Sequence, residues 1–173
     1  AVDTKFPIAY DSVDHLEPAG TKNDNSSNLD LIAEMEKDLC ETSPRLHILD
    51  LGCAGGGLVH DFVKKGHIAV GLEGSDYNVI HSRAEWPILY QKNLFTCDIT
   101  REYSIQIQKG QKTEPFACDL VTAWEVVEHI PPDRLAYFFE FIRQHLKIGG
   151  RFVGGISLCT AEPHHSSLFS ISD

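Results

Sequence analysis

The sequence lacks any hydrophobic run long enough to cross a membrane, and its start has no basic stretch followed by an apolar one. A membrane-spanning helix needs about 20 consecutive apolar residues, so an integral membrane protein is not expected. A secretory leader is not expected either, because such leaders join a basic segment to an apolar one. These absences favour a globular protein without a membrane partner.

Cysteine pairs with metal-binding spacing are also missing. The chain has no Cys-x-x-Cys sequence among its five cysteines, which are Cys40, Cys53, Cys97, Cys118 and Cys159. Zinc ribbons depend on such pairs and disulfide frameworks on an even set, so neither is expected. Reduced thiols are typical of a cytoplasmic protein, and we predict that location.

Clustered basic residues are absent as well. The chain carries 15 Lys and Arg against 25 Asp and Glu, a formal net charge of −10, and only Lys64 and Lys65 are adjacent. Binding of nucleic acid depends on grouped cations that neutralise phosphates. A nucleic-acid partner is therefore not expected, and a small-molecule substrate is favoured.

What the sequence does contain is enough apolar material for one core. Its 173 residues, 42% of them hydrophobic, suit a single globular domain. Residues 1–27 include prolines, a glycine and the polar run TKNDNSSN, which indicates an N-terminal arm, and residues 28–173 form the domain. Phe6, Ile8 and Tyr10 could close over a ligand, although a loosely docked arm is the simpler interpretation.

Apolar runs alternate with segments of helical spacing along the rest of the chain. Strands are expected at 46–51, 68–73, 94–97, 118–123 and 151–156. Helices are expected at 29–39, at 57–65, at 76–84 before Trp86-Pro87, and from Pro132 to Gly149-Gly150. The polar segment 101–115 indicates a surface excursion, such as a small hairpin. This alternation predicts an α/β fold with a doubly wound, mostly parallel sheet and helices on both faces.

One stretch organises the chain, from His47 to Asp76: HILDLGCAGGGLVHDFVKKGHIAVGLEGSD. A strand ends in a group of glycines, a helix follows, and a second strand ends at Glu73. Glycines let a ligand approach the backbone closely, and the N–H groups at the start of the next helix face it. A carboxylate about 20 residues further on is placed to accept hydrogen bonds from a ribose. The pattern therefore predicts a nucleotide-like cofactor at this turn.

Two pieces of this stretch, ILDLGCAGGG and GLEGSD, resemble the glycine-rich loop and the acidic ribose-binding turn of class I S-adenosylmethionine (SAM) dependent methyltransferases. The resemblance continues through Cys97-Asp98-Ile99 and DLVTAWEVVEHIPP to GGRFVGGIS and covers residues 46–157. It departs at Ala54, where that family usually has a glycine. The resemblance implies transfer of a methyl group from SAM to an oxygen or nitrogen of a small molecule.

The resemblance also implies which residues bind the cofactor. They are Asp50, Gly52, Cys53, Ala54, Glu73, Gly74, Cys97, Asp98, Ile99 and Trp124. The glycine loop would line the methionine end, Glu73 would take the ribose hydroxyls, and Asp98 would bind the adenine amino group with its two neighbours beside the ring. Trp124 would form a wall of the site. For Asp50 and Asp98 a structural role, as a helix or turn cap, is an equal alternative.

The EVVEHIP segment places His129 shortly after the fourth expected strand. It resembles a segment of small-molecule O-methyltransferases in this class, which implies that His129 could accept the acceptor's proton. Orientation of the loop is the competing role. His164 and His165 could reach the same edge of the sheet, but adjacent histidines do not easily bind one ion, and we expect no metal.

By the same resemblance, the strand order should be 3-2-1-4-5, followed by an antiparallel pair. Only residues 157–173 follow the fifth expected strand, which is too short for a helix and two more strands. We therefore expect the antiparallel strands to be absent or truncated. The fifth strand would then be an exposed edge through which two copies could form a homodimer.

Two other functions are alternatives. Gly52, Ala54 and Gly57 fit a loose G-x-A-x-x-G pattern, which would suit an NAD-dependent oxidoreductase. That function gives no role to Asp98 or to residues 124–129, and no Tyr-x-x-x-Lys pair is present. The other alternative is a methyltransferase-like domain that binds cofactor or a partner without turnover, suggested by the short C-terminal part.

Overall fold

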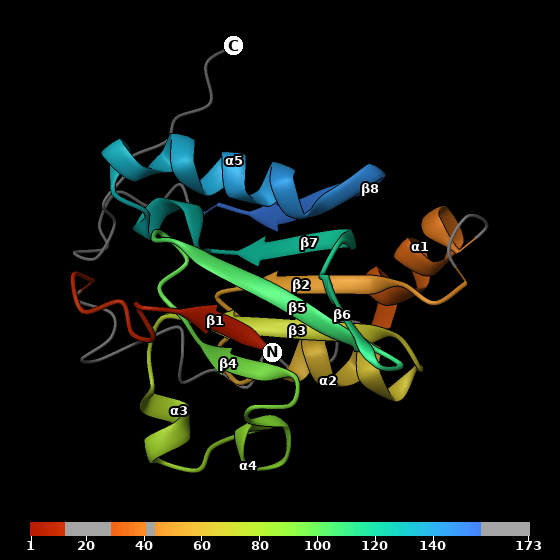
Figure 1. Ribbon diagram of the computed structural model, residues 1–173, viewed down its shortest axis with the longest axis horizontal. Helices are drawn as coiled ribbons and strands as arrows, with labels where there is room; N and C mark the ends of the chain where they lie inside the picture. The colour runs from red at the N-terminus through yellow and green to blue at the C-terminus, as the bar shows by residue number, and fades with distance from the viewer. Residues whose placement is uncertain (13–28, 41–43, 157–173) are drawn as a thin grey trace.

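The chain is built around a five-stranded parallel sheet with the strand order β4-β3-β2-β7-β8 (Figure 1). The computed structural model describes residues 1–12, 29–40 and 44–156. The strands of this sheet are β2 (His47–Leu51), β3 (Ile68–Glu73), β4 (Leu94–Thr96), β7 (Cys118–Trp124) and β8 (Leu146–Gly155). Counted along the chain this is the order 3-2-1-4-5, so the expected doubly wound α/β fold is confirmed.

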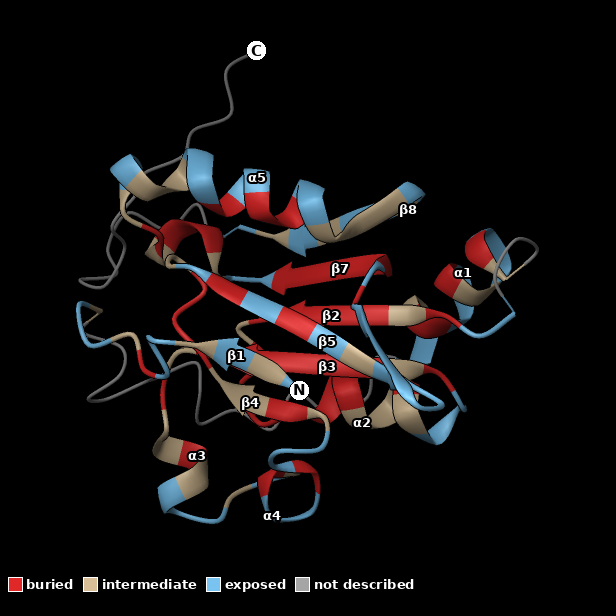
Figure 2. Cartoon of the chain, in the orientation of Figure 1, coloured by how far each residue is buried: buried red, intermediate tan, exposed pale blue. Residues whose placement is uncertain are grey.

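The three central strands are buried because nearly all of their side chains are apolar. β2 pairs with β3 on one side and with β7 on the other, which places Asp50 between Gly71 and Thr122. Such uniformly apolar strands suit a parallel sheet that is covered on both faces. Figure 2 shows these strands as an almost continuous buried layer. The polar side chains of Asp50 and Thr122 therefore need partners inside the protein.

Helices cover one face of the sheet. They are α1 (Leu29–Leu39), α2 (Gly57–Lys64) and α4 (Trp86–Leu89), with the short α3 (Tyr77–Ile80) preceding α4. Phe62 and Trp86 belong to the core cluster between these helices and the sheet. α1 has the bounds predicted from spacing, because Ile32, Met35 and Leu39 lie on one buried side. No helix in the described part of the chain is long and apolar enough to cross a membrane.

A helix and a small second sheet cover the other face. These elements are α5 (Leu135–His145) and a three-stranded antiparallel sheet of β1 (Val2–Thr4), β5 (Tyr103–Lys109) and β6 (Lys112–Pro115). Tyr103 and Ile105 of β5 are buried in the core, whereas Ser104 and Gln106 are exposed. The segment predicted as a surface hairpin is thus a hairpin with one apolar side, lying across the parallel sheet (Figure 1).

The first residues of the chain form a strand where a loose arm was expected. β1 pairs antiparallel with residues 103–105 of β5. Further along, the Ile8 side chain is buried, and Ala9 N donates a hydrogen bond to Gly74 O at 2.9 Å. The local sequence gives no sign of β1, because its partner lies far along the chain. Residues 13–28, the rest of the expected arm, lie outside the described residues.

The helix expected at 76–84 is shorter in the structure and is followed by a second turn. Ser82 and Ala84 have φ values of 49° and 47°, so the chain leaves the helical conformation after α3. Trp86-Pro87 then begins α4 instead of only ending a helix. Proline is tolerated in the first turn of a helix, where its missing N–H has no intrahelical partner to lose.

The end of α5 also differs from the expectation. α5 ends at His145 and β8 begins at once, so Gly149 does not close the helix. The register of β8 against β7 shifts between Cys118 and Leu120, and Gly149, with φ +82°, lies in the irregular part of β8. Residues 157–173, where the antiparallel strands were considered, lie outside the described residues.

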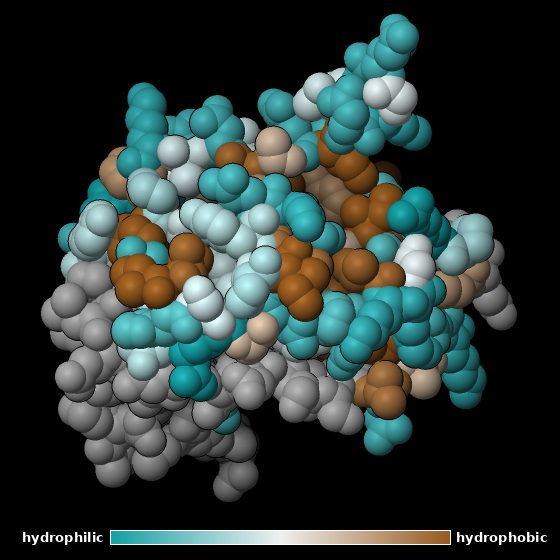
Figure 3. All heavy atoms as spheres, turned by 90° about the horizontal axis from the view of Figure 1, so that it is seen from below, coloured by the Kyte–Doolittle hydropathy of each residue, from teal (hydrophilic) through white to brown (hydrophobic). Residues whose placement is uncertain are grey.

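Exposed apolar side chains occur on two sides of the molecule, beside β8 and on the side of α3 and α4. Beside β8 they are Phe139 on α5 and Ile148, Phe152 and Ile156 on or next to the strand. On the α3–α4 side, Figure 3 shows apolar side chains as separate patches among polar ones, and Ile80 and Ile88 are exposed. The apolar side chains of the β8 side lie on two neighbouring elements.

Candidate functional site

Four loops meet at the carboxyl edge of the parallel sheet. They follow β2, β3, β4 and β7 and span residues 52–56, 74–76, 97–102 and 125–134. In open α/β sheets, ligands bind outside the carboxyl ends of the strands. The residues predicted to bind a cofactor all lie in these loops or at the strand ends before them.

The loop after β2 is a tight turn that is held from two sides. Gly52 N and Cys53 N donate to one carbonyl of β3 at 2.8 and 3.0 Å. Ala54 has φ 45°, a left-handed conformation that costs a non-glycine residue about 1–2 kcal/mol. Its carbonyl accepts hydrogen bonds from Trp86 Nε1 at 2.7 Å and from Asn78 Nδ2 at 3.1 Å. Side chains from α3 and α4 thus hold an alanine in a conformation that favours glycine.

Gly52 packs directly against Val126 in the loop after β7. A Cβ atom at position 52 would lie 2.4 Å from Val126 Cγ2, well inside van der Waals contact. The backbone of Gly52, with φ +69°, also favours glycine. Sequence reasoning missed Val126, because nothing in its own segment shows which loop it contacts.

Glu73 ends β3 as a buried carboxylate, 7% exposed. Its Oε2 accepts a hydrogen bond from Ala54 N at 2.9 Å, and its Oε1 accepts one from Ser75 N at 3.1 Å. The carboxylate therefore links the glycine loop to the end of the neighbouring strand. A carboxylate can accept more than two hydrogen bonds, so these contacts are compatible with the predicted ribose contact.

Asp50 is buried within β2 and does not cap the following helix. Thr122 Oγ1 donates to Asp50 Oδ1 at 2.7 Å, and no side chain caps α2, whose N-cap residue is Gly56. Burial raises the pKa of Asp50 to about 7, the Thr122 hydrogen bond opposes the shift, and the charge of Glu73 adds to it. The helix-capping role is thereby excluded, and Asp50 can change its charge near neutral pH.

Asp98 caps the turn after β4. Its Oδ1 accepts hydrogen bonds from Thr100 N at 2.9 Å and Thr100 Oγ1 at 2.6 Å, and Arg101 Nε lies 3.6 Å from its Oδ2. The structural role considered for Asp98 is therefore present. The side chains of Cys97 and Ile99 lie in the hydrophobic core. A ligand at this turn would meet these two residues through their backbone.

The segment after β7 separates the predicted residues. Trp124 is 38% exposed and lies toward β8, since a Cβ atom at Gly155 would be 3.3 Å from its ring. His129 is half-buried at the end of a short turn, and its N–H donates to Val126 O at 3.0 Å. The side chain that contacts Gly52 is thus Val126, whereas the Trp124 ring lies near Gly155 of β8.

In the sequence, the candidate metal ligands are His164 and His165 together with Glu128 or His129. The two adjacent histidines lie outside the described residues. Within residues 1–12, 29–40 and 44–156, no group of three or more His, Cys, Asp or Glu side chains is placed to hold a metal ion. The described site is made of backbone groups and carboxylates.

The N-terminal segment runs across the ends of β3 and β4. Phe6 O accepts a hydrogen bond from Asp98 N at 2.8 Å, and Ala9 N donates to Gly74 O at 2.9 Å. A Cβ atom at Gly74 would lie 3.0 Å from the Ala9 side chain. Residues 6–9 therefore lie against the two strand ends that the resemblance assigns to ribose and adenine.

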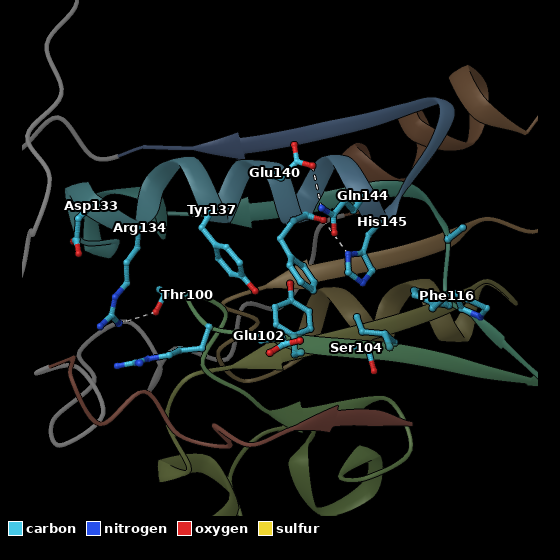
Figure 4. A pocket seen from close by; sticks show the side chains of 16 residues that line it. Thr100, Glu102, Ser104, Phe116, Asp133, Arg134, Tyr137, Glu140, Gln144 and His145 are labelled. Atoms are coloured by element: carbon cyan, nitrogen blue, oxygen red, sulfur yellow. Dashed lines mark hydrogen bonds between the residues drawn. The ribbon is translucent and has the colours of Figure 1, made fainter.

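A groove of about 730 Å³ lies between β5 and α5, and Figure 4 shows Arg134 near one end and His145 near the other. Its floor is aromatic: the rings of Tyr103 and Phe141 lie 4.1 Å apart, and those of Phe141 and His145 lie 4.5 Å apart. Arg101 and Arg134 both line it. The groove was not predicted, because its residues come from separate segments without a shared motif.

The chain matches the model of a family described as a methyltransferase domain over residues 49–152. This span contains the glycine loop, Glu73, Asp98 and the segment after β7, and it covers more than half of the chain. The chain belongs to this methyltransferase family, as its resemblance implied.

A curated relative gives the family a particular example. The chain is 30% identical over 124 residues to a ubiquinone biosynthesis O-methyltransferase of Roseobacter denitrificans. The aligned part makes up 69% of this chain and 45% of the relative. The chain therefore spans less than half the length of that protein.

Solved structures share the fold. A SAM-bound structure of CalS10, an amino pentose methyltransferase from Micromonospora echinaspora, matches with a TM-score of 0.52 at 21% identity, covering 75% of this chain and 51% of CalS10. DesVI of Streptomyces venezuelae matches with a TM-score of 0.49 at 21% identity, covering 70% of this chain and 48% of DesVI. At these identities the likeness concerns architecture alone.

Proposed function

We propose that this chain is the SAM-binding domain of a methyltransferase that acts on an oxygen or nitrogen of a small molecule. The observation that carries the proposal is the pair of hydrogen bonds by which Glu73 links the glycine loop to the end of β3, in a member of the methyltransferase family. This arrangement, in which a glycine turn joins a strand to a helix and the next strand ends in a carboxylate, suits a nucleoside. The ribose of the nucleoside would lie at the carboxylate.

The residues at this edge fit SAM in their hydrogen-bonding groups. Gly52 and Gly56, with φ values of +69° and +86°, let the loop turn sharply, and their missing side chains leave room for Val126 and Leu94. Glu73 would accept the ribose hydroxyls, and Asp98 would accept the adenine amino group. SAM supplies an electrophilic methyl group on a sulfonium. The task of this chain is to hold the donor and acceptor in line.

Removal of the acceptor's proton is assigned to His129. This residue follows the end of β7 and is half-buried, and its backbone N–H donates a hydrogen bond to Val126 O. A neutral imidazole can accept a proton near physiological pH. His129→Gln should lower turnover and leave affinity for S-adenosylhomocysteine (SAH) unchanged; a parallel loss of affinity would indicate loop orientation instead.

A small-molecule acceptor and a cytoplasmic location are part of the proposal. The net charge of −10 disfavours nucleic acid. The curated relative is named an O-methyltransferase, which favours oxygen as the acceptor atom. Cys40, Cys53, Cys97 and Cys118 are free thiols, which is typical of a reducing compartment.

The test is calorimetric titration of the chain with SAH. Glu73→Gln removes the negative charge with little change of shape, and the loss of charge-assisted hydrogen bonds should weaken SAH binding by about 1.5–3 kcal/mol. Glu114→Gln on β6 serves as the matched control, because this exposed residue lies outside the four loops. Thermal melting of both variants checks that the fold is intact.

Absence of SAH binding by the unaltered chain would contradict the proposal. Binding of NADH in its place would favour the oxidoreductase alternative. SAH binding without turnover of any acceptor would favour the non-catalytic alternative.

A further inference from the structure

Two arginines from different elements contact one carboxylate oxygen at an end of the groove between β5 and α5. Arg134 Nη2 donates to Asp11 Oδ2 at 3.1 Å, and Arg101 Nη2 donates to the same oxygen. Arg134 Nη1 also donates to Thr100 Oγ1 at 3.0 Å. Both arginines hold the pKa of Asp11 below its usual range, and the hydrogen bond from Arg134 is the largest single cause. Paired guanidinium groups of this kind are a strong recognition element for carboxylates.

The remainder of the groove floor is aromatic and uncharged. Tyr103 is buried, its ring lies 4.1 Å from Phe141, and Phe141 lies 5.8 Å from Tyr137. Burial lowers the pKa of His145 and raises the pKa of Tyr103, which keeps both rings neutral in neutral solution. Figure 4 shows Tyr137 and His145 extending from α5 toward β5. A flat apolar group suits this floor, because aromatic rings stack favourably on one another.

Acidic residues of the groove restrict where an anion can lie. Glu102, Asp133 and Glu140 also line it. Glu140 is held by Arg143 through hydrogen bonds of 2.7 and 2.8 Å on the exposed side of α5. Like charges oppose an anionic group beside these carboxylates, so such a group is favoured only near the arginine pair. A ligand with one carboxylate would therefore bind in a single orientation.

The arginine end of the groove adjoins the proposed cofactor site. Arg101 Nε lies 3.6 Å from Asp98 Oδ2, and Asp98 is the residue proposed to bind adenine. Arg134 follows the segment 125–130 that carries His129. A ligand anchored on the two arginines would thus lie next to the edge where the methyl donor is proposed to bind.

We infer that the groove between β5 and α5 is a binding site for an aromatic carboxylate, whose carboxylate contacts Arg101 and Arg134 and whose ring lies along the groove. Asp11 takes the place of that carboxylate when no ligand is bound. The inference goes beyond the proposed function, because it assigns a second ligand to a groove beside the proposed cofactor site. A groove of about 730 Å³ is within the usual range for small-molecule sites. The Asp11 side chain is 56% exposed, so it can be displaced without opening the core.

The experiment measures binding of para-hydroxyphenylpropanoate and of its neutral amide to the chain saturated with SAH. The acid should bind about tenfold more tightly than the amide, because only the acid offers a charge-assisted pair of hydrogen bonds to the arginines. Arg134→Gln should abolish this preference. Asp11→Asn should strengthen acid binding several-fold and leave the amide unchanged, since it removes the competing carboxylate.

Arg151→Gln is the matched control. It also removes one guanidinium charge, but Arg151 is exposed on β8, and neither Arg151 nor its ion-pair partner Asp38 lines the groove. This variant should keep the preference for the acid. The ratio of acid affinity to amide affinity is measured within each variant. A substitution that loosens the whole groove weakens both ligands and leaves this ratio unchanged.

Equal affinity for acid and amide would overturn the inference. A preference that survives Arg134→Gln, or an Asp11→Asn variant that binds the acid no better, would overturn it as well. So would the absence of acid binding at millimolar concentration with SAH bound. Failure of the proposed function is distinguishable, because there SAH itself does not bind.

Discussion

Asp50 and Glu73 are buried carboxylates on neighbouring strands, and the fold gives them different environments. Glu73 accepts hydrogen bonds from the backbone N–H groups of Ala54 and Ser75. For Asp50, the hydrogen bond donated by Thr122 only partly offsets the effect of burial, which raises its pKa to about 7. Glu73 thus connects two backbone segments, whereas Asp50 titrates near neutrality.

The pKa of Asp50 predicts a pH-dependent stability. Because this pKa is raised from 3.8 to about 7, the unfolded chain releases the proton first, and stability falls as the pH rises between these two values. Asp50→Asn keeps an oxygen that can accept the Thr122 hydroxyl and removes the titration. The free energy of unfolding of the natural chain should therefore fall relative to that of the variant by up to about 1.4 kcal/mol per pH unit.

Urea unfolding between pH values of roughly 4 and 7 measures this difference. Asp133→Asn, at an exposed position, is the control and should follow the natural chain. Parallel stability curves for the natural chain and Asp50→Asn would show that Asp50 is ionised throughout this range.

At the scale of elements, α3 and α4 hold the glycine loop from outside it. Trp86→Phe removes the Nε1 donor to Ala54 O but keeps most of the buried ring. Loss of a buried hydrogen bond should lower the free energy of unfolding by about 1–2 kcal/mol. SAH affinity should fall as well, because Ala54 then has only the Asn78 bond to hold its left-handed conformation.

Urea unfolding and SAH titration check this prediction. Phe62→Leu is the control, because Phe62 is buried in the same core cluster as Trp86 and donates no hydrogen bond; it should lower stability and leave SAH affinity unchanged. Equal effects of the two substitutions on SAH affinity would show that loss of core packing, and not loss of the donor, is responsible.

Elements that depend on local pattern could be predicted from the sequence. α1 repeats its apolar residues at helical spacing, and β2, β3 and β7 are apolar runs that end in turn residues. β1 could not be predicted, since three residues become a strand only by pairing with β5. The abrupt change from α5 to β8 was missed for a related reason: pairing with β7 overrides the glycine signal at Gly149.

In the candidate site, too, some contacts follow from local sequence pattern and others only from the three-dimensional fold. The glycine loop and Glu73 belong to one continuous stretch, whose pattern predicts a single site, and Glu73 accepts a hydrogen bond from Ala54 N of that loop. Two other contacts depend on the three-dimensional fold. Val126 reaches Gly52 because β7 lies beside β2, and Arg101 and Arg134 meet at Asp11 because of the path of the N-terminal segment. Contacts of this kind leave no signal in any single segment of the sequence.

At the scale of the whole molecule, the exposed edge of β8 bears on whether two copies of the chain associate. In the described part of the chain, β8 pairs only with β7, and Phe139 and Phe152 are exposed beside it with their rings 6.1 Å apart. Exposed strand edges with apolar side chains favour pairing between molecules. We propose that two copies form a homodimer across this edge.

Light scattering over a range of concentrations tests the homodimer. The mass should rise toward twice that of the chain, and Phe152→Lys should keep it monomeric, because a charge on an edge strand opposes pairing. Ile88→Lys on α4 is the control, since Ile88 is exposed on the opposite side of the molecule. A monomer at every concentration would contradict the proposal.

The pairing of β1 with β5 also sets an order of events during synthesis. Residues 2–4 leave the ribosome well before residues 103–105, their partners in the sheet, and this is the longest interval between paired strands in the described chain. Contacts between distant segments form late, because closing the long loop between them costs entropy. We therefore expect the ends of β3 and β4 to become covered late in folding. Hydrogen exchange at Ala9 N–H during refolding would time the moment when the N-terminal segment covers them.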